Sequence, residues 1–439
     1  MPNLPKGSKR LLNAWAFYDW ANSVYSLVIA SAIFPIFYQA LFKSAGVNTV
    51  SIFGGAIRST PLISYTTAAA FLVVAIISPL LSGIADYVGN KKNFMKFFCY
   101  LGAISCMGLY FFSIESIHIS LLFYFGGLIG FWGSLVFYNS YLPDVAFPEQ
   151  QDRVSARGYS LGYIGSVVLL LFNLGMVMFP EAFGFGEGGE ASMKAMRWSF
   201  VTVGVWWILF SQYSFYFLPK GNKSGKRVST KILLNGFKEL KSVYGSLSEN
   251  IQLKRYLAAF FVYSMAVQTV MLVATYFGEQ EIAWGADNAK TMGLIISILI
   301  IQLVAVGGAI LTSRASEKFG NIPVLVVINI IWVGICVVAF FIQEPLQFYI
   351  TAGVVGLVMG GIQSLSRSTY SKFLPETKDT TSYFSFYDVA EKIGIVIGML
   401  IYGFIDQITG SMRNSILFLV LFFMAGVFLL LRVPRNKNH

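Results

Sequence analysis

The feature that most constrains this chain is a long succession of apolar stretches. A helix needs about 20 mostly apolar residues to cross a bilayer, and twelve stretches of the 439-residue chain are near or above that length. They cover residues 11–42, 60–85, 97–114, 117–141, 158–180, 198–219, 256–278, 291–313, 321–343, 346–366, 382–405 and 414–431. Only 12% of all residues are charged, whereas soluble domains average about 25%. We therefore expect an all-α membrane protein with twelve transmembrane helices.

Residues with catalytic or metal-binding chemistry are sparse. The three cysteines, Cys99, Cys106 and Cys336, lie inside apolar stretches and form no CxxC pair, which indicates buried thiols rather than a disulfide framework or a zinc site. Two histidines are too few for a histidine-based metal site. The sequence contains no GxxxxGK[ST] phosphate loop. We expect no cofactor, no metal and no enzymatic activity.

The distribution of basic residues predicts the topology. With a cytoplasmic N-terminus, 25 of the 32 lysines and arginines fall in cytoplasmic segments and one, Lys392, falls within a span. The six others are Lys43, Arg58, Lys194, Arg197, Lys290 and Arg413. Because cytoplasmic loops carry an excess of basic residues, we expect both termini in the cytoplasm. The net charge of +11 then marks topology and contact with anionic membrane lipids, not nucleic-acid binding.

Short motifs repeat in the two parts of the chain. Asp86 and Glu317 lie 231 positions apart, and so do Gly89 and Gly320. The segments YNSYLPD and TYSKFLPE, which end the fourth and tenth stretches, match at an offset of 232. Two parallel six-helix repeats are the organisation of major facilitator transporters.

A basic, polar segment, 220–255, separates the sixth and seventh stretches. We interpret it as a cytoplasmic linker. It would join an N-terminal six-helix half, residues 1–219, to a C-terminal half, residues 256–439.

The loop after the second stretch, GIADYVGNKK, carries a family resemblance. Its motif residues are Gly83, Asp86, Gly89, Lys91 and Lys92. The pattern resembles the cytoplasmic loop motif of the major facilitator superfamily, although Tyr87 stands where that motif usually has arginine. More specifically, AFYDWANSVYS (residues 16–26) and YNSYLPD resemble the vacuolar amino-acid effluxer family linked to autophagy and its shorter bacterial relatives.

This resemblance implies a major facilitator fold, alternating access and a small solute, with amino acids such as leucine first. Since the chain lacks long inserts, it also implies a bacterial inner membrane. In the superfamily the loop aspartate contacts the start of the eleventh helix, so Asp86 would serve a gate, with Glu317 and Gly320 as the second-half counterparts. A carboxylate is favoured at a helix N-terminus by the helix dipole. The alternative is a basic turn that only fixes topology.

Four ionisable residues lie inside the spans, where charge is costly and marks candidate functional sites. Asp19 begins a stripe with Asn22, Ser23 and Ser26 at helical spacing, so this face should point to the bundle interior or an aqueous cavity. In the eleventh span, Asp388 and Lys392 have the i, i+4 spacing of a helix ion pair, and Glu391 adjoins them. Asp19 and Lys392 could also pair across the two halves.

Two functional roles remain open for these residues. In one, Asp19 binds the amino group of an amino acid, and Lys392 or Arg367 binds its carboxylate. In the other, Asp19 or Glu391 carries a proton, because burial favours the neutral carboxyl. A purely structural charge pair is the third interpretation.

Weaker candidates lie on the spans that line the cavity in the superfamily. They are Tyr138, Asn139, Gln268, Gln363 and Arg367. Each alone is more often an interhelical hydrogen bond. We predict a secondary transporter of a small solute, most plausibly an amino acid. The alternatives are a sugar, nucleoside or drug carrier of the same fold, and a non-transporting membrane receptor or scaffold.

Overall fold

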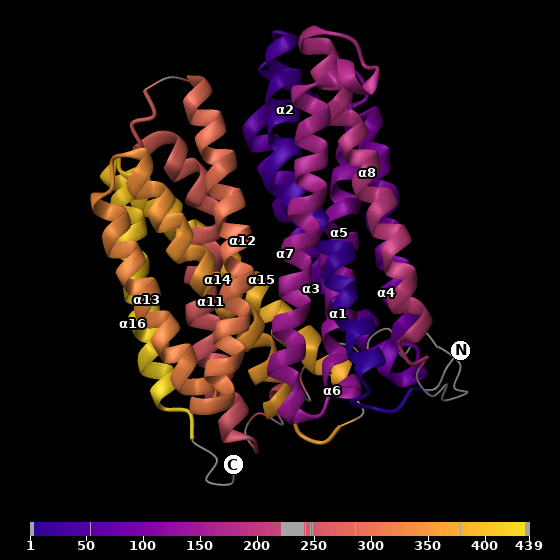
Figure 1. Ribbon diagram of the computed structural model, residues 1–439, viewed down its shortest axis with the longest axis vertical. Coiled ribbons are helices and arrows are strands. Elements are labelled where there is room, and N and C mark those ends of the chain that lie inside the picture. The colour runs from indigo at the N-terminus through magenta and orange to yellow at the C-terminus, as the bar shows by residue number, and fades with distance from the viewer. Residues whose placement is uncertain are drawn as a thin grey trace. The chain divides into compact units, whose positions relative to one another are not determined.

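A computed structural model describes residues 4–52, 54–220, 241, 243–245, 247, 249–285, 287–377 and 379–434. The elements before the predicted linker are α1 Lys9–Val24, η1 Tyr25–Ala32, α2 Ile33–Ser44, β1 Thr49–Ile52, β2 Gly55–Arg58, α3 Ser59–Val88, α4 Lys91–Gly108, η2 Leu109–Phe111, α5 Ile117–Ser140, α6 Leu142–Val145, α7 Pro148–Met178, η3 Pro180–Phe183 and α8 Gly188–Phe217. Those after it are α11 Ile251–Glu281, α12 Asp287–Phe319, α13 Asn321–Phe341, α14 Pro345–Phe373, α15 Thr380–Thr409 and α16 Met412–Leu431 (Figure 1).

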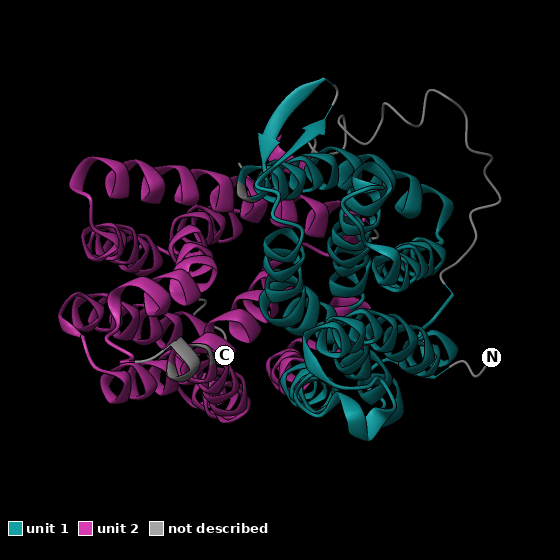
Figure 2. Cartoon of the chain, turned by 90° about the horizontal axis from the view of Figure 1, so that it is seen from above, with its two compact units in different colours: residues 1–141, 161–236 teal, residues 142–160, 237–439 magenta. Residues whose placement is uncertain are grey.

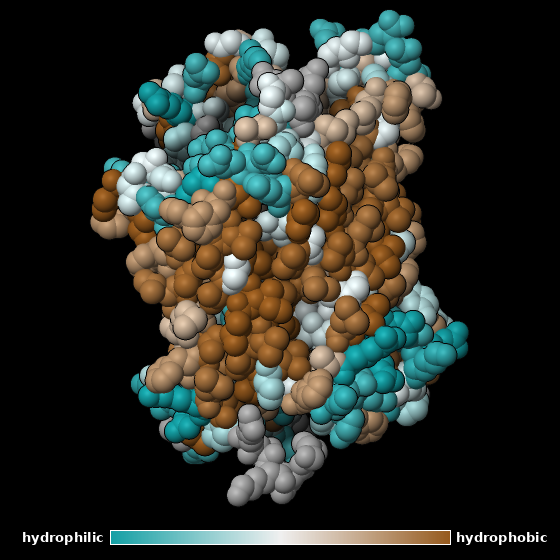
Figure 3. All heavy atoms as spheres, turned by 60° about the vertical axis from the view of Figure 1, so that its left-hand side comes forward, coloured by the Kyte–Doolittle hydropathy of each residue, from teal (hydrophilic) through white to brown (hydrophobic). Residues whose placement is uncertain are grey.

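The prediction of an all-α membrane protein is confirmed. Each of the twelve apolar stretches corresponds to one long helical run in the described residues, the first run being α1, η1 and α2 together. Ten of these runs are long and apolar enough to cross a membrane. The other two, α8 and α15, have 30 residues each. One face of the surface shows a broad hydrophobic zone with hydrophilic residues gathered at both ends (Figure 3).

The first helical run is not uniform. Its middle section, η1, is a π-helix of eight residues between two α-helices. The Ser31 hydroxyl donates to the Ser26 carbonyl at 2.9 Å, a separation of five residues that fits this wider helix. Because a π-helix advances by more residues per turn, it changes which residues share a face. Asp19 and Asn22 are buried, Ser23 is half-buried and Ser26 is exposed; that these residues share one polar face remains a prediction.

Several helices extend beyond their apolar stretches, and α7 and α14 do so where they carry polar residues of interest. α7 begins at Pro148, ten residues before the predicted start at 158, and α14 continues to Phe373, beyond the predicted end at 366. A short antiparallel hairpin, β1–β2, precedes α3 and pairs Thr49 with Arg58. The predicted linker falls largely outside the described residues, which omit 221–240, 242, 246 and 248.

The chain forms two compact units (Figure 2). The first comprises Met1–Tyr141 and Leu161–Gly236, and the second comprises Leu142–Ser160 and Phe237–His439. The beginning of α7 thus packs with the second unit, while the rest of this helix belongs to the first. The predicted boundaries of the two halves remain predictions.

The two units repeat one packing pattern, as the sequence repeat predicts. In the first, α1 packs on α8, α3 packs on α5, and α4 packs on both α5 and α8. In the second, α11 packs on α16, α12 packs on α14, and α13 packs on both α14 and α16. The repeated glycines also occupy equivalent places: Gly89 follows α3 with φ 68° and Gly320 follows α12 with φ 83°. Glycine adopts such positive φ angles at little steric cost.

An arginine near the start of the last long helix of the first unit fixes the end of a neighbouring one. Arg197 of α8 donates from Nη1 to the carbonyls of Tyr110 and Phe112, each at 2.7 Å. Its guanidinium lies 4.9 Å from the centre of the Phe37 ring, within the limit of about 6 Å for a cation–π contact. These carbonyls end the α4–η2 run and would otherwise lack partners.

The second unit repeats this clamp. Arg413 of α16 donates from Nη1 to the carbonyls of Phe340 at 2.9 Å and Ile342 at 2.6 Å, at the end of α13. It adds an ion pair from Nε to Glu281 Oε2 at 2.7 Å and lies 5.7 Å from the Phe277 ring centre. The shared clamp shows that the repeat extends from helix packing to individual side chains.

Candidate functional site

A polar cluster in the first unit centres on Asp19, where α5 reaches α1. Asp19 and Tyr138 are 4% and 0% exposed. The Tyr138 hydroxyl donates a 2.7 Å hydrogen bond to Asp19 Oδ2. The Trp15 indole donates to the Tyr138 carbonyl at 3.0 Å, and the two rings stack with centroids 4.6 Å apart. A neutral donor held rigidly by α5 therefore contacts the carboxylate that the sequence singled out.

The neighbouring residues of α1 complete this cluster. Asn22 is buried, and its Oδ1 accepts a weak 3.4 Å hydrogen bond from the Ser23 hydroxyl. Its Nδ2 is buried with no hydrogen-bond partner among the described residues. α7 approaches closely, since a Cβ at Gly162 would lie 2.5 Å from Ser23 Oγ. Asn139, one residue after Tyr138, is half-buried.

A second polar cluster, called the α15 cluster, consists of Gln268, Asp388, Glu391 and Lys392. Lys392 Nζ lies 2.7 Å from Asp388 Oδ1 and 3.2 Å from Glu391 Oε2. The Gln268 amide, on α11, donates to Glu391 Oε1 at 2.9 Å. Lys392 is 2% exposed and Asp388 is 6% exposed. Two carboxylates share one ammonium, so the fully ionised cluster carries one surplus negative charge.

The two remaining candidates of α14 have different surroundings. Gln363 donates from Nε2 to Met271 Sδ at 3.5 Å. Arg367 donates from Nε to Ser155 Oγ and from Nη2 to the Ser155 carbonyl, both at 3.0 Å. Its guanidinium lies 4.2 Å from the Tyr159 ring centre. Arg367, predicted as a partner of a solute carboxylate, thus anchors the beginning of α7 in the second unit.

Sequence reasoning missed the polar network around Asp152, near the start of α7. Asp152 pairs with Lys372 of α14 at 2.5 Å, accepts from the Asn321 amide at 2.9 Å and accepts from the Ser316 hydroxyl at 3.1 Å. Next to it, Arg153 forms an ion pair with Glu317 at 3.1 Å. Asp152 lies in a run that resembles an ordinary polar loop, so the sequence offered no signal for its burial.

The predicted gating residues lie at helix ends. Lys91 donates to the Ser140 carbonyl at 3.0 Å, where α5 ends, and Lys92 donates to the Leu218 carbonyl at 2.6 Å, where α8 ends. Cationic side chains at helix C-termini are favoured by the helix dipole. Gly83 and Asp86 lie in the last turns of α3. The contact predicted for Asp86 with the start of the eleventh helix remains a prediction.

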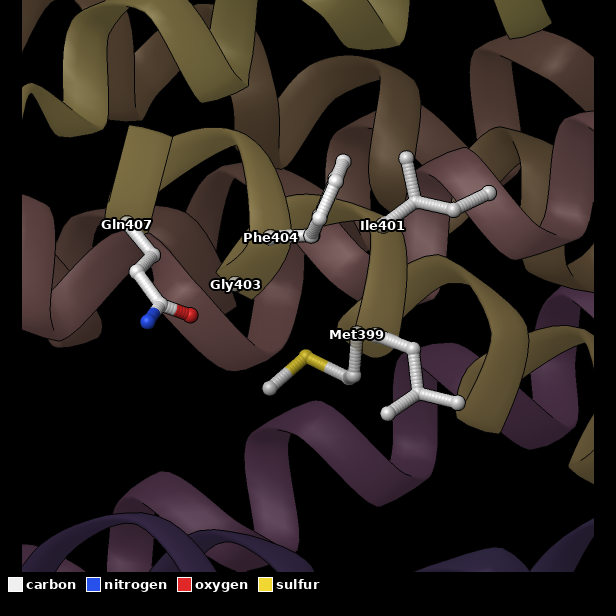
Figure 4. Close-up of a pocket in the computed structure, with 6 residues that line it drawn as sticks. Met399, Ile401, Gly403, Phe404 and Gln407 are labelled. Atoms are coloured by element: carbon white, nitrogen blue, oxygen red, sulfur yellow. The ribbon is translucent and has the colours of Figure 1, made fainter. Parts of the chain in front are cut away.

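An open, shallow hollow lies on the surface of α15 beyond the α15 cluster (Figure 4). Its lining residues are Met399, Leu400, Ile401, Gly403, Phe404 and Gln407. Met399 and Gly403 follow Lys392 by seven and eleven residues and so share its helix face. One face of α15 therefore changes from charged to mostly apolar over roughly 10 Å.

These groups can bind a charged solute or a proton through carboxylates, an ammonium, amides and hydroxyls. In the part of the chain that the structure describes, no group of three or more His, Cys, Asp or Glu side chains could hold a metal ion.

Known proteins share this architecture over nearly the whole chain. The fucose:proton symporter FucP of E. coli superposes with a TM-score of 0.65 at 16% identity, covering 97% of this chain and 98% of that chain. The human organic anion transporter MFSD10 gives a TM-score of 0.71 at 11% identity, with 96% and 99% coverage. Similarity at this identity establishes the fold.

Sequence relatives establish the family. An uncharacterized MFS-type transporter of Bacillus subtilis, YxiO, is 32% identical over 97% of this chain and 95% of that protein. Autophagy-related protein 22 of Eremothecium gossypii is 24% identical over 98% of this chain and 92% of that protein. Residues 7–439 match the family described as "Vacuole effluxer Atg22 like". The chain is therefore a multi-pass membrane transporter of the major facilitator type and belongs to the Atg22-like effluxer family.

Proposed function

We propose that this transporter moves an amino acid across a bacterial inner membrane by alternating access. The observation that carries the proposal is the surplus negative charge of the α15 cluster, where Asp388 and Glu391 share Lys392. A buried charge needs a partner of opposite sign. The ammonium group of an amino acid supplies that partner, whereas a neutral sugar or nucleoside does not.

The first unit supports the same class of solute. Asp19 is a second buried carboxylate, and its hydrogen bond comes from the neutral hydroxyl of Tyr138. The orphaned amide nitrogen of Asn22 is a donor that suits a carboxylate oxygen. The first unit therefore offers groups that complement both ends of a zwitterion, a carboxylate and an amide.

We also propose that both termini are cytoplasmic and that membrane lipids contact the basic side. The asymmetry of the lysines and arginines supports this orientation. Lys91 and Lys92, on the predicted cytoplasmic side, hold helix ends in the first unit. Arg153 and Lys372, also on that side, form ion pairs in the second.

Transport by purified protein in proteoliposomes tests the proposal. A panel of amino acids, sugars and nucleosides is offered with and without a pH gradient. We expect uptake of amino acids, most strongly of leucine-like ones, and loss of uptake in Asp19→Asn. Glu190→Gln is the matched control, because Glu190 is an exposed acid at the start of α8. Uptake confined to sugars or nucleosides would favour the alternative carriers. An Asp19→Asn variant with intact transport and pH dependence contradicts the role of Asp19.

A further inference from the structure

The α15 cluster carries one more negative than positive charge in a buried position. Asp388 and Glu391 contribute two carboxylates, and Lys392 contributes one ammonium. Isolated buried charges are strongly disfavoured, so such a group pairs with a counter-charge or becomes neutral. When no solute is bound, a proton from water is the simplest species that removes the surplus.

The hydrogen bonds of the cluster indicate which carboxyl takes that proton. Both oxygens of Glu391 have donors, the Gln268 amide at Oε1 and the Lys392 ammonium at Oε2. Asp388 accepts from Lys392 at Oδ1, but its Oδ2 is buried with no hydrogen-bond partner among the described residues. Donors stabilise the charged form of a carboxyl. Glu391 is therefore the better carboxylate and Asp388 the better carboxylic acid.

Among the described residues, no hydrogen bond or ion pair joins Asp388 to a second cation. α11 presents the Tyr256 and Tyr263 hydroxyls, which bond to each other at 3.2 Å and to Ser366 of α14. The Tyr370 hydroxyl of α14 donates to a backbone carbonyl of α15 at 2.5 Å. In α16 the one charged residue is Arg413, which pairs with a glutamate of α11.

We propose that Asp388 Oδ2 is the proton-binding atom of the transporter and that its proton exchanges with the ammonium group of the solute. Proton binding forms one O–H bond at Oδ2 and takes the cluster from −1 to neutral, while Lys392 stays paired with Glu391. Arrival of an ammonium group supplies the same positive charge, so the O–H bond breaks and the proton leaves to water. This inference rests on the proposed function for its solute and makes the protein a proton antiporter.

Infrared difference spectroscopy of the purified full-length protein identifies the proton-binding carboxyl. Spectra at acidic minus alkaline pH should contain a carboxylic C=O band that shifts in D₂O. We expect Asp388→Asn to remove this band, while Glu391→Gln and Asp19→Asn keep it. A band that survives in Asp388→Asn but disappears in Glu391→Gln assigns the proton to Glu391 and overturns the proposal. A wild-type spectrum without such a band overturns it as well. Monodisperse elution of each variant shows that it is folded.

The exchange is tested separately by adding leucine to weakly buffered protein that contains a pH indicator dye. We expect about one proton released per leucine bound, and no release from Asp388→Asn. Proton uptake, or binding without release, overturns the exchange. Failure of leucine to bind contradicts the proposed solute class, whereas the infrared band still decides whether Asp388 binds the proton.

Discussion

The two units share a scaffold but differ in the charges that they bury. Arg197 and Arg413 clamp equivalent helix ends through pairs of backbone carbonyls. In the first unit, Asp19 accepts a hydrogen bond from a tyrosine hydroxyl. In the second, two carboxylates compete for Lys392. The duplicated framework has thus kept its helix contacts while its polar chemistry diverged.

This difference indicates a division of labour between the units. A solute group that reaches Asp19 meets a carboxylate that already accepts a hydrogen bond from a neutral hydroxyl. A cluster with a surplus charge changes its pairing whenever a proton or an ammonium group arrives. Coupling between solute and proton should therefore depend on the second unit, and the variants below test how far the two units differ.

The largest effect is expected for Lys392→Met. It leaves the buried Asp388 and the half-buried Glu391 next to each other without their ammonium. Removing one partner of a buried ion pair typically costs about 3–5 kcal/mol, so we expect a large fall in the melting temperature of the detergent-solubilised protein.

Two further variants serve as controls for Lys392→Met. The double variant Lys392→Met/Asp388→Asn should recover part of the loss, because Glu391 then keeps the Gln268 amide as its donor. Asp19→Asn in the first unit should melt near the wild type, since the Tyr138 hydroxyl can still donate. If Lys392→Met and Asp19→Asn lower the melting temperature equally, the two units do not differ in their buried charges as proposed.

A smaller effect is expected at the two clamps. Hydrogen bonds to charged groups contribute about 1.5–3 kcal/mol, so both Arg197→Met and Arg413→Met should lower stability. Arg413→Met should cost more, because Arg413 also pairs with Glu281. Thermal melting of the two variants together with Glu281→Gln separates the carbonyl bonds from the ion pair. If neither arginine variant melts earlier, the clamps do not stabilise the repeat.

The fold was predictable from the sequence because each transmembrane helix requires a long apolar stretch, and such stretches can be read directly from the sequence. Features that depend on distant polar partners were not. α7 starts early because residues before its apolar stretch, such as Asp152, find partners on α12–α14 more than 160 positions away. The π-helical section of the first run involves backbone pairings that apolar composition does not encode.

The candidate site also combines contacts that the sequence predicts with contacts that it does not. The pairing of Asp388 with Lys392 was predictable from their i, i+4 spacing, and the structure has it at 2.7 Å. The bond from Gln268 to Glu391 joins positions 123 residues apart, which a single sequence cannot reveal. Arg367 looked available for a solute carboxylate, but its hydrogen bonds to Ser155 depend on where α7 begins.

Tyr138→Phe tests the first unit with a more modest change. It removes the donor to Asp19 while the Trp15 stacking surface remains. We expect a loss of about 1.5 kcal/mol in stability and weaker solute binding, seen as a raised KM for uptake in proteoliposomes. The dependence of uptake on the pH gradient should persist, because the α15 cluster is intact. Loss of that dependence in Tyr138→Phe would place coupling in the first unit instead.

The smallest effect is expected at Gly162, which, like Gly398 in the second unit, lets two helices approach closely. A Cβ at Gly162 of α7 would meet Ser23 Oγ on α1 at 2.5 Å. A Cβ at Gly398 of α15 would meet Thr269 Oγ1 on α11 even more closely, and the Met265 carbonyl at 3.1 Å. The units therefore share this close approach, but the neighbours differ in their freedom to move.

Gly162→Ala should cost less than Gly398→Ala, although its Cβ would also lie 3.2 Å from the Asp19 carbonyl. Replacing glycine by alanine in a helix stabilises it by about 1 kcal/mol. This gain offsets the cost of rotating the Ser23 hydroxyl away from the new methyl group. Gly398→Ala should cost about 1–3 kcal/mol, because Thr269 already bonds the Met265 carbonyl at 2.7 Å and has little rotational freedom. Melting temperatures of both variants, each with and without Ser23→Ala or Thr269→Ala, measure the difference. If Gly162→Ala lowers the melting temperature as much as Gly398→Ala does, Ser23 on α1 is held as rigidly as Thr269 on α11.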